Sequence, residues 1–375
     1  MLKGVYLTLL IGPAVPLPAP KIVTDALSGI QVTSSKDTSG FQIHFTVGKK
    51  SPLLLALLPA GFFDPITTRV VIIVTLNGVP NVIMDGLVTN QEVSPSSEPG
   101  KSTLTITGED LSLAMDLIQK IIPYPAFPMV ARINLALAPY AALGIIPVVI
   151  PPIIPETKSP TQGWETQRMT DREYIKSQAR RAGYVFFIQP GPLPGQNIAY
   201  FGPDANIPFP QPALSINMDA HTNVESLSFS LNGMAKAIRV YTIMDPATNK
   251  IPIPIPVPNI SPFKPPMGIK PVLPARLEFA TESAQLSPTE AAQDILGYLL
   301  NNTASVSANG SLDVVRYKGL LRARMMVGVR GAGITYDGLY YVDSVSHDIK
   351  HGEYKQSFTL SRDGVISNTP VVIPN

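Results

Sequence analysis

Apolar and polar residues alternate along several short segments, and this period of two predicts β-strands with one buried face. Phe41 to Val47 is the clearest case, and Thr103 to Thr107 repeats the pattern. Val70 to Leu76 is almost continuously apolar, as in a strand buried on both faces, and Asn77 and Gly78 follow it as a typical hairpin turn. We therefore expect residues 1–108 to form a small β-barrel domain, with no helix before residue 108.

Three later segments carry helix-start signals. Thr107 and Asp110 precede a first amphipathic run in which Leu111, Met115 and Ile118 share one face. Thr170 and Glu173 have the spacing of a capping box. The helix that follows would bury Ile175, Ala179 and Ala182 and end at Gly183, while a third helix over residues 288–301 would begin with Ser287 as its cap and Pro288 at its first position.

Strand patterns return after Gly183. The candidates are Tyr184 to Gln189, Ile198 to Phe201, Val224 to Leu231, Arg322 to Val329, Leu339 to Ser346 and Glu353 to Ser361. We predict a mainly β fold with a smaller α+β part: two small β-barrel domains, at residues 1–108 and 216–375, and an intermediate α+β domain at residues 109–215. The last two candidate strands, Leu339 to Ser346 and Glu353 to Ser361, would form a closing hairpin at one edge of the second barrel, with its counterpart in the first barrel near Phe41 to Thr107.

A proline-rich arm covers residues 251–275, with nine prolines between Ile251 and Pro274. Proline lacks a backbone donor, so we expect polyproline II rather than a helix or the interior of a sheet. Fully extended at ~3.1 Å per residue, the arm would cover about 70 Å. It could reach a neighbouring subunit or form a semi-rigid loop on its own subunit.

Two apolar stretches resemble membrane or targeting segments. Ile133 to Ile154 has no formal charge over 22 residues, but four prolines interrupt it. Because a membrane does not tolerate unpaired backbone groups, we expect a short buried helix and a proline-rich strap instead. The amino-terminal apolar run is broken by Gly12 and Pro13, so a buried strand is expected there rather than a signal peptide.

Composition narrows the possible functions. Charged residues make up only 15% of the chain, which suggests that partners cover much of its surface. The net charge of +2 gives no general support for nucleic-acid binding. The absence of cysteine excludes disulfides, thiolate metal sites and a cysteine nucleophile.

Few residues suggest catalysis. His347 and His351 are four apart, a spacing that can hold a metal on a helix, but Gly352 beside them favours a turn. His44 and His221 have no evident chemical partner. The run of Gly100, Lys101 and Ser102 lacks the first glycine of a phosphate-binding loop, and Gly328 to Gly333 lacks dinucleotide-binding spacing. The sequence nominates no catalytic, cofactor-binding or metal-binding residue.

One basic stripe stands out on the second predicted helix. Arg172, Lys176 and Arg180 recur every four residues, with Arg181 beside them. They could be a solvated face or could meet an acidic patch on a partner protein.

The order of these blocks resembles the late-control D and baseplate-hub family of contractile phage tails. The matching segments span nearly the whole chain: Leu2 to Phe45, Val82 to Val88, Leu104 to Ser112, Thr170 to Phe186 and Asp337 to Arg362. The resemblance implies a homotrimer with two barrels per subunit, forming a pseudo-sixfold ring related to the amino-terminal part of type VI secretion spike proteins.

Such a ring would join the hexameric tail tube, or a tube-initiator protein, to a trimeric spike, which we expect to be a separate polypeptide. Other baseplate wedge proteins would be further partners. The implied location is the tail baseplate of a virion, assembled in the host cytoplasm, either in a phage or in a phage-derived injection system. We expect a structural protein without a cofactor or enzymatic activity; the alternative is a tail-associated hydrolase of peptidoglycan or surface glycan.

Overall fold

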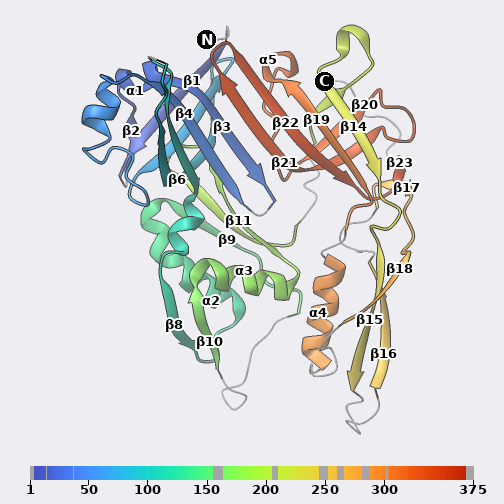
Figure 1. The fold of residues 1–375 in the computed structure, drawn as a ribbon. Coiled ribbons are helices and arrows are strands. Elements are labelled where there is room, and N and C mark those ends of the chain that lie inside the picture. Colours follow the sequence, from blue (N-terminus) through green and yellow to red (C-terminus); the bar gives the residue numbers. More distant parts are fainter. Residues whose placement is uncertain are drawn as a thin grey trace.

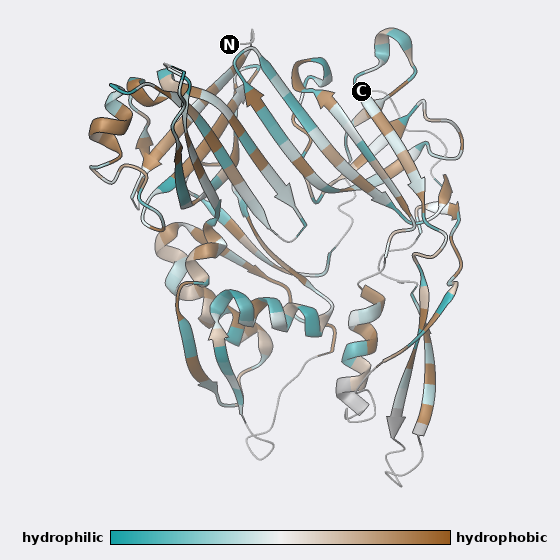
Figure 2. Ribbon diagram, in the orientation of Figure 1, coloured by the Kyte–Doolittle hydropathy of each residue, from teal (hydrophilic) through white to brown (hydrophobic). Residues whose placement is uncertain are grey.

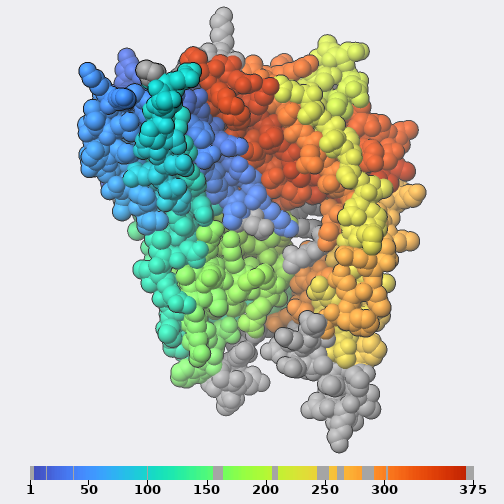
Figure 3. All heavy atoms as spheres, in the orientation of Figure 1, coloured from blue at the N-terminus to red at the C-terminus, as the bar shows by residue number. Residues whose placement is uncertain are grey.

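The computed structural model describes residues 4–13, 15–36, 38–98, 100–154, 164–204, 210–244, 252–259, 266–280, 288–300 and 303–368. The fold is mainly β. Figure 1 shows one large sheet with two smaller lobes below it, which we call the first lobe (residues 111–202) and the second lobe (residues 237–300). In the space-filling view of Figure 3 the two lobes extend downward from the sheet side by side.

The amino-terminal half of the sheet confirms the strands expected from alternation. Its elements are β1 (Val5–Gly12), β2 (Leu17–Pro18), α1 (Lys21–Ala26), β3 (Leu27–Ser35), β4 (Ser39–Val47), the π-helical turn η1 (Leu53–Leu57), β5 (Arg69–Leu76), β6 (Val79–Ser94) and β7 (Ser102–Asp110). The expectation of no helix before residue 108 was wrong, because α1 and η1 are held by burial of Val23 and Leu53, with no capping side chain to reveal them.

The carboxyl-terminal half contributes a similar set. It comprises β13 (Gln211–Ser215), the 3-10 turn η5 (Asp219–His221), β14 (Ser226–Leu231), β19 (Val306–Asp313), α5 (Val314–Tyr317), β20 (Met326–Arg330), β21 (Gly338–Lys350), β22 (Glu353–Arg362) and β23 (Val365–Ser367). The predicted closing hairpin is therefore β21–β22. Figure 2 shows apolar and polar residues mixed along these strands.

The two halves repeat one topology. In the first the sheet order is β3-β4-β7-β6-β5-β1, and in the second it is β14-β19-β22-β21-β20-β13. The strands also follow one another along the chain in the same sequence, with a helical segment after β4 and after β19. All pairings agree in direction except the last, since β1–β5 is antiparallel and β13–β20 is parallel. The hairpin β6–β7 is thus the counterpart of the closing hairpin.

The first lobe contains η2 (Leu111–Met115), β8 (Gln119–Tyr124), α2 (Met129–Leu137), η3 (Ala138–Leu143), β9 (Ile145–Val149), β10 (Glu165–Thr170), α3 (Asp171–Ala182), β11 (Val185–Pro190) and β12 (Asn197–Gly202). The capping box of Thr170 and Glu173 and the left-handed Gly183 are both present, as predicted. The buried helix expected within Ile133 to Ile154 is α2, followed by η3 and β9.

The first predicted helix is only the 3-10 turn η2. Thr107 lies within β7, and Asp110 alone caps the turn by accepting a hydrogen bond from the Ser112 backbone N–H at 2.9 Å. Ile118 is 65% exposed and does not share a buried face with Met115. The turn ends early because β8 begins at Gln119 and pairs with β10.

The second lobe contains β15 (Ala237–Met244), β16 (Pro252–Pro258), β17 (Gly268–Lys270), β18 (Arg276–Phe279) and α4 (Pro288–Leu300), so the third helix is confirmed. Its predicted cap, Ser287, lies outside the described residues. Polyproline II was the wrong expectation for residues 252–258, which form an edge strand antiparallel to β15. The prolines alternate with Ile253, Ile255 and Val257. The N–H groups of these three residues can point toward β15, and the prolines, which have no N–H, occupy the positions that point away from it.

Candidate functional site

The two halves of the sheet meet at β3 and β21, and we call this strand pair the internal seam. These strands pair antiparallel, with Val32 opposite His347 and Thr33 opposite Ser346. The hydroxyl oxygens of Thr33 and Ser346 are 3.0 Å apart. One apolar core runs beneath both halves and includes Val32 and Tyr354, so the strand pairing also closes a shared interior.

His347 was expected in a turn, but it is buried within β21. Its Nδ1 lies 2.7 Å from the Tyr354 hydroxyl and 3.4 Å from Gln356 Nε2. An amide nitrogen can only donate, so Nδ1 is the acceptor and the ring is neutral. Burial lowers the pKa of His347 to about 4, with a smaller contribution from Arg322. The turn itself holds His351, which is exposed, and no group of residues suited to a metal occurs in the described part of the chain.

A cavity of about 350 Å³ lies where the first lobe approaches this seam. Its lining includes Phe187 and Tyr200 from the first lobe and Arg324 and Tyr341 from the second half of the sheet. Asp204 accepts a hydrogen bond from the Tyr341 hydroxyl at 2.8 Å and lies 3.0 Å from Lys36 Nζ. Burial, followed by the charge of Asp204, raises the pKa of Tyr341 above its ordinary range.

Arg324 adds contacts at the same place, which is a first junction between the first lobe and the sheet. Its guanidinium lies 4.1 Å from the centre of the Phe187 ring and donates a hydrogen bond to the Ser35 carbonyl. The other basic residue of the lining, Arg322, donates to Asn81 at 2.7 Å. Because the charged groups of the cavity are engaged with protein partners, the arrangement is suited to holding three parts of the chain together.

A buried ion pair forms a second junction. Arg69 Nε and Nη2 each lie 2.7 Å from an oxygen of Asp85, and Asn197 Nδ2 donates to the same carboxylate at 2.8 Å. Arg69 and Asp85 belong to the sheet, whereas Asn197 begins β12 of the first lobe. Sequence reasoning missed this site, although one acid inside the apolar run Val82 to Val88 was a usable signal.

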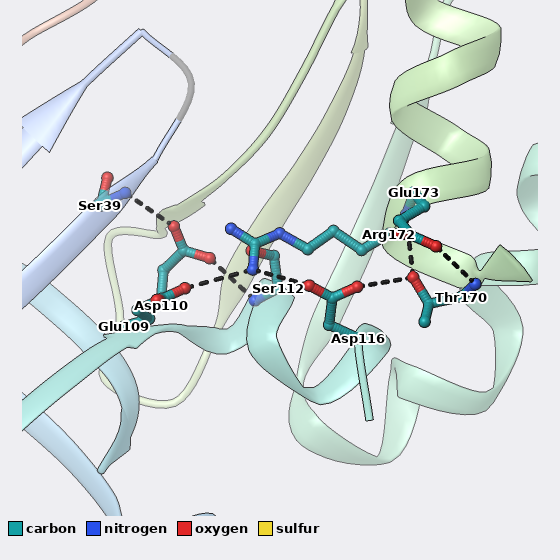
Figure 4. Close-up of polar contacts among 8 residues, drawn as sticks. All are labelled: Ser39, Glu109, Asp110, Ser112, Asp116, Thr170, Arg172 and Glu173. Atoms are coloured by element: carbon teal, nitrogen blue, oxygen red, sulfur yellow. Dashed lines mark hydrogen bonds and ion pairs between the residues drawn. The ribbon is translucent and has the colours of Figure 1, made fainter. Parts of the chain in front are cut away.

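A third junction is drawn in Figure 4. Arg172 of α3 donates to Glu109 at 3.2 Å and to Asp116 at 3.3 Å, and Asp116 also accepts from the Thr170 hydroxyl at 2.6 Å. The stripe on α3 is therefore not one uniform solvated face. Arg172 ties the helix to the end of β7, and Arg181 lies 3.3 Å from Glu165, whereas Arg180 is exposed.

Structural comparison places this architecture among tail proteins. A tail protein from Neisseria meningitidis matches with a TM-score of 0.63 at 11% identity, covering 97% of this chain and 98% of that one. The 43 kDa tail protein of prophage MuSo2 from Shewanella oneidensis matches with a TM-score of 0.59 at 14% identity, covering 96% and 98%. The chain has the fold of phage tail proteins.

This tail-protein fold also occurs in secretion machinery. The E. coli c3393 protein, a component of the type VI secretion system with structural similarity to the T4 tail proteins gp27 and gp5, matches with a TM-score of 0.55 at 11% identity, covering 93% of this chain and 77% of that one. No family model matches the chain, and no curated protein is similar to it in sequence. The resemblance seen in the sequence is confirmed as a structural match.

The remaining sequence candidates lie at ordinary places in the tail-protein fold. His44 Nδ1 is 3.2 Å from the Thr105 hydroxyl on the neighbouring strand, and His221 is exposed in η5. Lys101 precedes β7 in the loop after β6, and Gly328 lies inside β20. Among the described helices none has the length and apolar character needed to cross a membrane.

Proposed function

We propose that this chain is a structural baseplate hub protein of a contractile phage tail or a phage-derived injection system. Three copies would form a pseudo-sixfold ring that joins the hexameric tail tube to a trimeric central spike, with other baseplate proteins around it. The protein would act in the tail baseplate of the assembled particle, without enzymatic activity.

The observation that carries this proposal is the repeated topology of the sheet. Three chains with two equivalent halves each present six similar units, which is what a threefold assembly needs to meet a sixfold tube. Similarity to tail proteins over almost the full length of both chains supports the same role. The carboxylates of Asp85 and Asp204 each bind side chains from different parts of one subunit, which is consistent with a rigid building block.

Size-exclusion chromatography with light scattering tests the stoichiometry, and imaging of assembled tails tests the location. We expect a trimer in solution or on the tube, and threefold density between tube and spike. A chain that stays monomeric and never enters a tail would overturn the proposal. Clearing of purified cell-wall suspensions by this chain alone would instead favour the hydrolase alternative.

A further inference from the structure

Two strand edges, one of β14 at the end of the sheet and one along the second part of β6, have no partner within the described residues. Strand β14 pairs with β19 on one side only. The first part of β6, Val79 to Leu87, pairs with β5, but Asn90 to Ser94 pairs with β7 alone. Figure 1 shows β14 and β6 on opposite sides of the molecule. Unpaired edges of this kind are templates for another strand.

The repeat shows what each edge matches inside the chain. Strand β6 occupies the position of β21, and both are long strands whose two parts pair with different neighbours. Both also carry an irregularity at the equivalent point, between Val88 and Asn90 in β6 and between Val342 and Ser344 in β21. Strand β14 occupies the position of β3, and β3 is the strand that pairs with the second part of β21.

We infer that β14 of one copy pairs antiparallel with residues Asn90 to Ser94 of β6 in the next copy, repeating between chains the seam that β3 and β21 form within one. This inference rests on the proposed ring and names the edges that would close it. The contact is head to tail, so it leads to a closed ring when the rotation between copies fits.

The register follows from the internal seam. Counted from the irregularity that the two strands share, Glu92 of β6 corresponds to Ser346 of β21. Carried across the neighbouring strands, the same count makes Ser230 of β14 correspond to Thr33 of β3. Since Thr33 faces Ser346, Ser230 would face Glu92.

The same counting pairs Val93 with Phe229 and Gln91 with Leu231, which lies two positions after Phe229 on the same face of β14. Val93 is 40% exposed and Leu231 is 46% exposed in the single chain. At the internal seam the residue equivalent to Phe229 is Val32, which is fully buried. Pairing between chains would cover these apolar side chains, and the apolar area removed from water would favour the contact.

Disulfide trapping tests the register directly, because the chain has no cysteine of its own. Glu92→Cys combined with Ser230→Cys should give covalent dimers and trimers on non-reducing gels after mild oxidation. Opposed residues in antiparallel strands have Cα atoms about 4.5–5.5 Å apart, within disulfide range. Thr33→Cys with Ser346→Cys is the matched control, since it should close within one chain without a gain in mass.

A register-slip pair, Glu92→Cys with Ser228→Cys, should cross-link several-fold less. If light scattering shows a trimer and the internal control closes, but Glu92→Cys with Ser230→Cys gives no more cross-link than the slipped pair, the strand pairing is overturned and the ring survives. If the chain is monomeric at every concentration and with tail tubes present, both proposals are overturned.

A non-covalent variant gives an independent test. Val93→Lys places a charge on the exposed edge of β6 and should abolish trimer formation while leaving the thermal unfolding of the chain unchanged. Ile121→Lys is the matched control, because Ile121 is 79% exposed on β8 of the first lobe. A trimer that persists in Val93→Lys at the wild-type level would count against the pairing.

Discussion

Gly183 at the end of α3 lies against Gly297 of α4, so that a Cβ added to Gly183 would come within 2.6 Å of the Gly297 Cα. This contact is where the two lobes touch below the sheet, and Leu300 of α4 joins the core of the first lobe beside it. Gly183 therefore has two roles: it ends α3 in a left-handed conformation, with φ of 69°, and it makes room for the second lobe.

Replacing Gly183 by alanine should destabilise the chain more than the left-handed backbone alone requires. The conformational cost is about 1–2 kcal/mol, and the clash with α4 should add about 1–3 kcal/mol. Gly352→Ala is the matched control, because Gly352 has φ of 83° and open space around the added carbon. Chemical denaturation would measure the two free energies of unfolding. Equal losses in both variants would contradict tight packing of the lobes.

Arg172 and Asp116 should be energetically coupled across the junction in Figure 4. Because both side chains remain partly exposed, a double-mutant cycle with alanine should give a coupling of about 0.5–1 kcal/mol, decreasing with added salt. Arg180→Ala on the same helix should leave unfolding unchanged, since Arg180 is exposed. Zero coupling at low salt would show that this ion pair does not hold α3 to the segment that follows η2.

His347 should make the fold less stable as the pH falls. Its pKa is lowered to about 4 from the ordinary 6.5. Between these values the unfolded chain binds a proton that the folded chain does not, so stability decreases from pH 6.5 toward pH 4. The full effect is at most about 3 kcal/mol.

The measurement compares unfolding of wild type and His347→Gln at pH 7 and pH 5. The variant should lose less stability on acidification, because it has no imidazole to protonate in the unfolded chain. His221→Gln, which removes an exposed histidine, should behave as wild type. If all three proteins lose stability equally, His347 does not cause the pH dependence.

The sequence predicted what local chemistry determines. The alternation in Phe41 to Val47 and the cap at Thr170 each depend on neighbours a few residues away, and both were correct. His347 was misplaced because its burial depends on Val32 of β3, more than 300 positions earlier in the chain. The contact of Asp204 with Tyr341 likewise joins distant residues, and nothing in the local pattern indicates it.

The buried pair of Arg69 and Asp85 should be the most sensitive of the charged junctions. Both side chains are at least 95% buried, and the two hydrogen bonds between them are 2.7 Å long. Arg69→Met would leave the carboxylate of Asp85 with only Asn197 among these side-chain donors, and an uncompensated buried charge costs about 3–5 kcal/mol. Chemical denaturation of the purified chain would measure this loss.

Removing the charge as well should recover much of the stability. In Arg69→Met with Asp85→Asn the amide still fits between β5 and β12 and can hydrogen-bond to Asn197, so the double variant should unfold at a higher denaturant concentration than Arg69→Met alone. That order separates an unpaired charge from simple loss of packing. If the double variant is the less stable of the two, the cost of Arg69→Met comes from lost side-chain volume, and the pair holds the first lobe by shape rather than by charge.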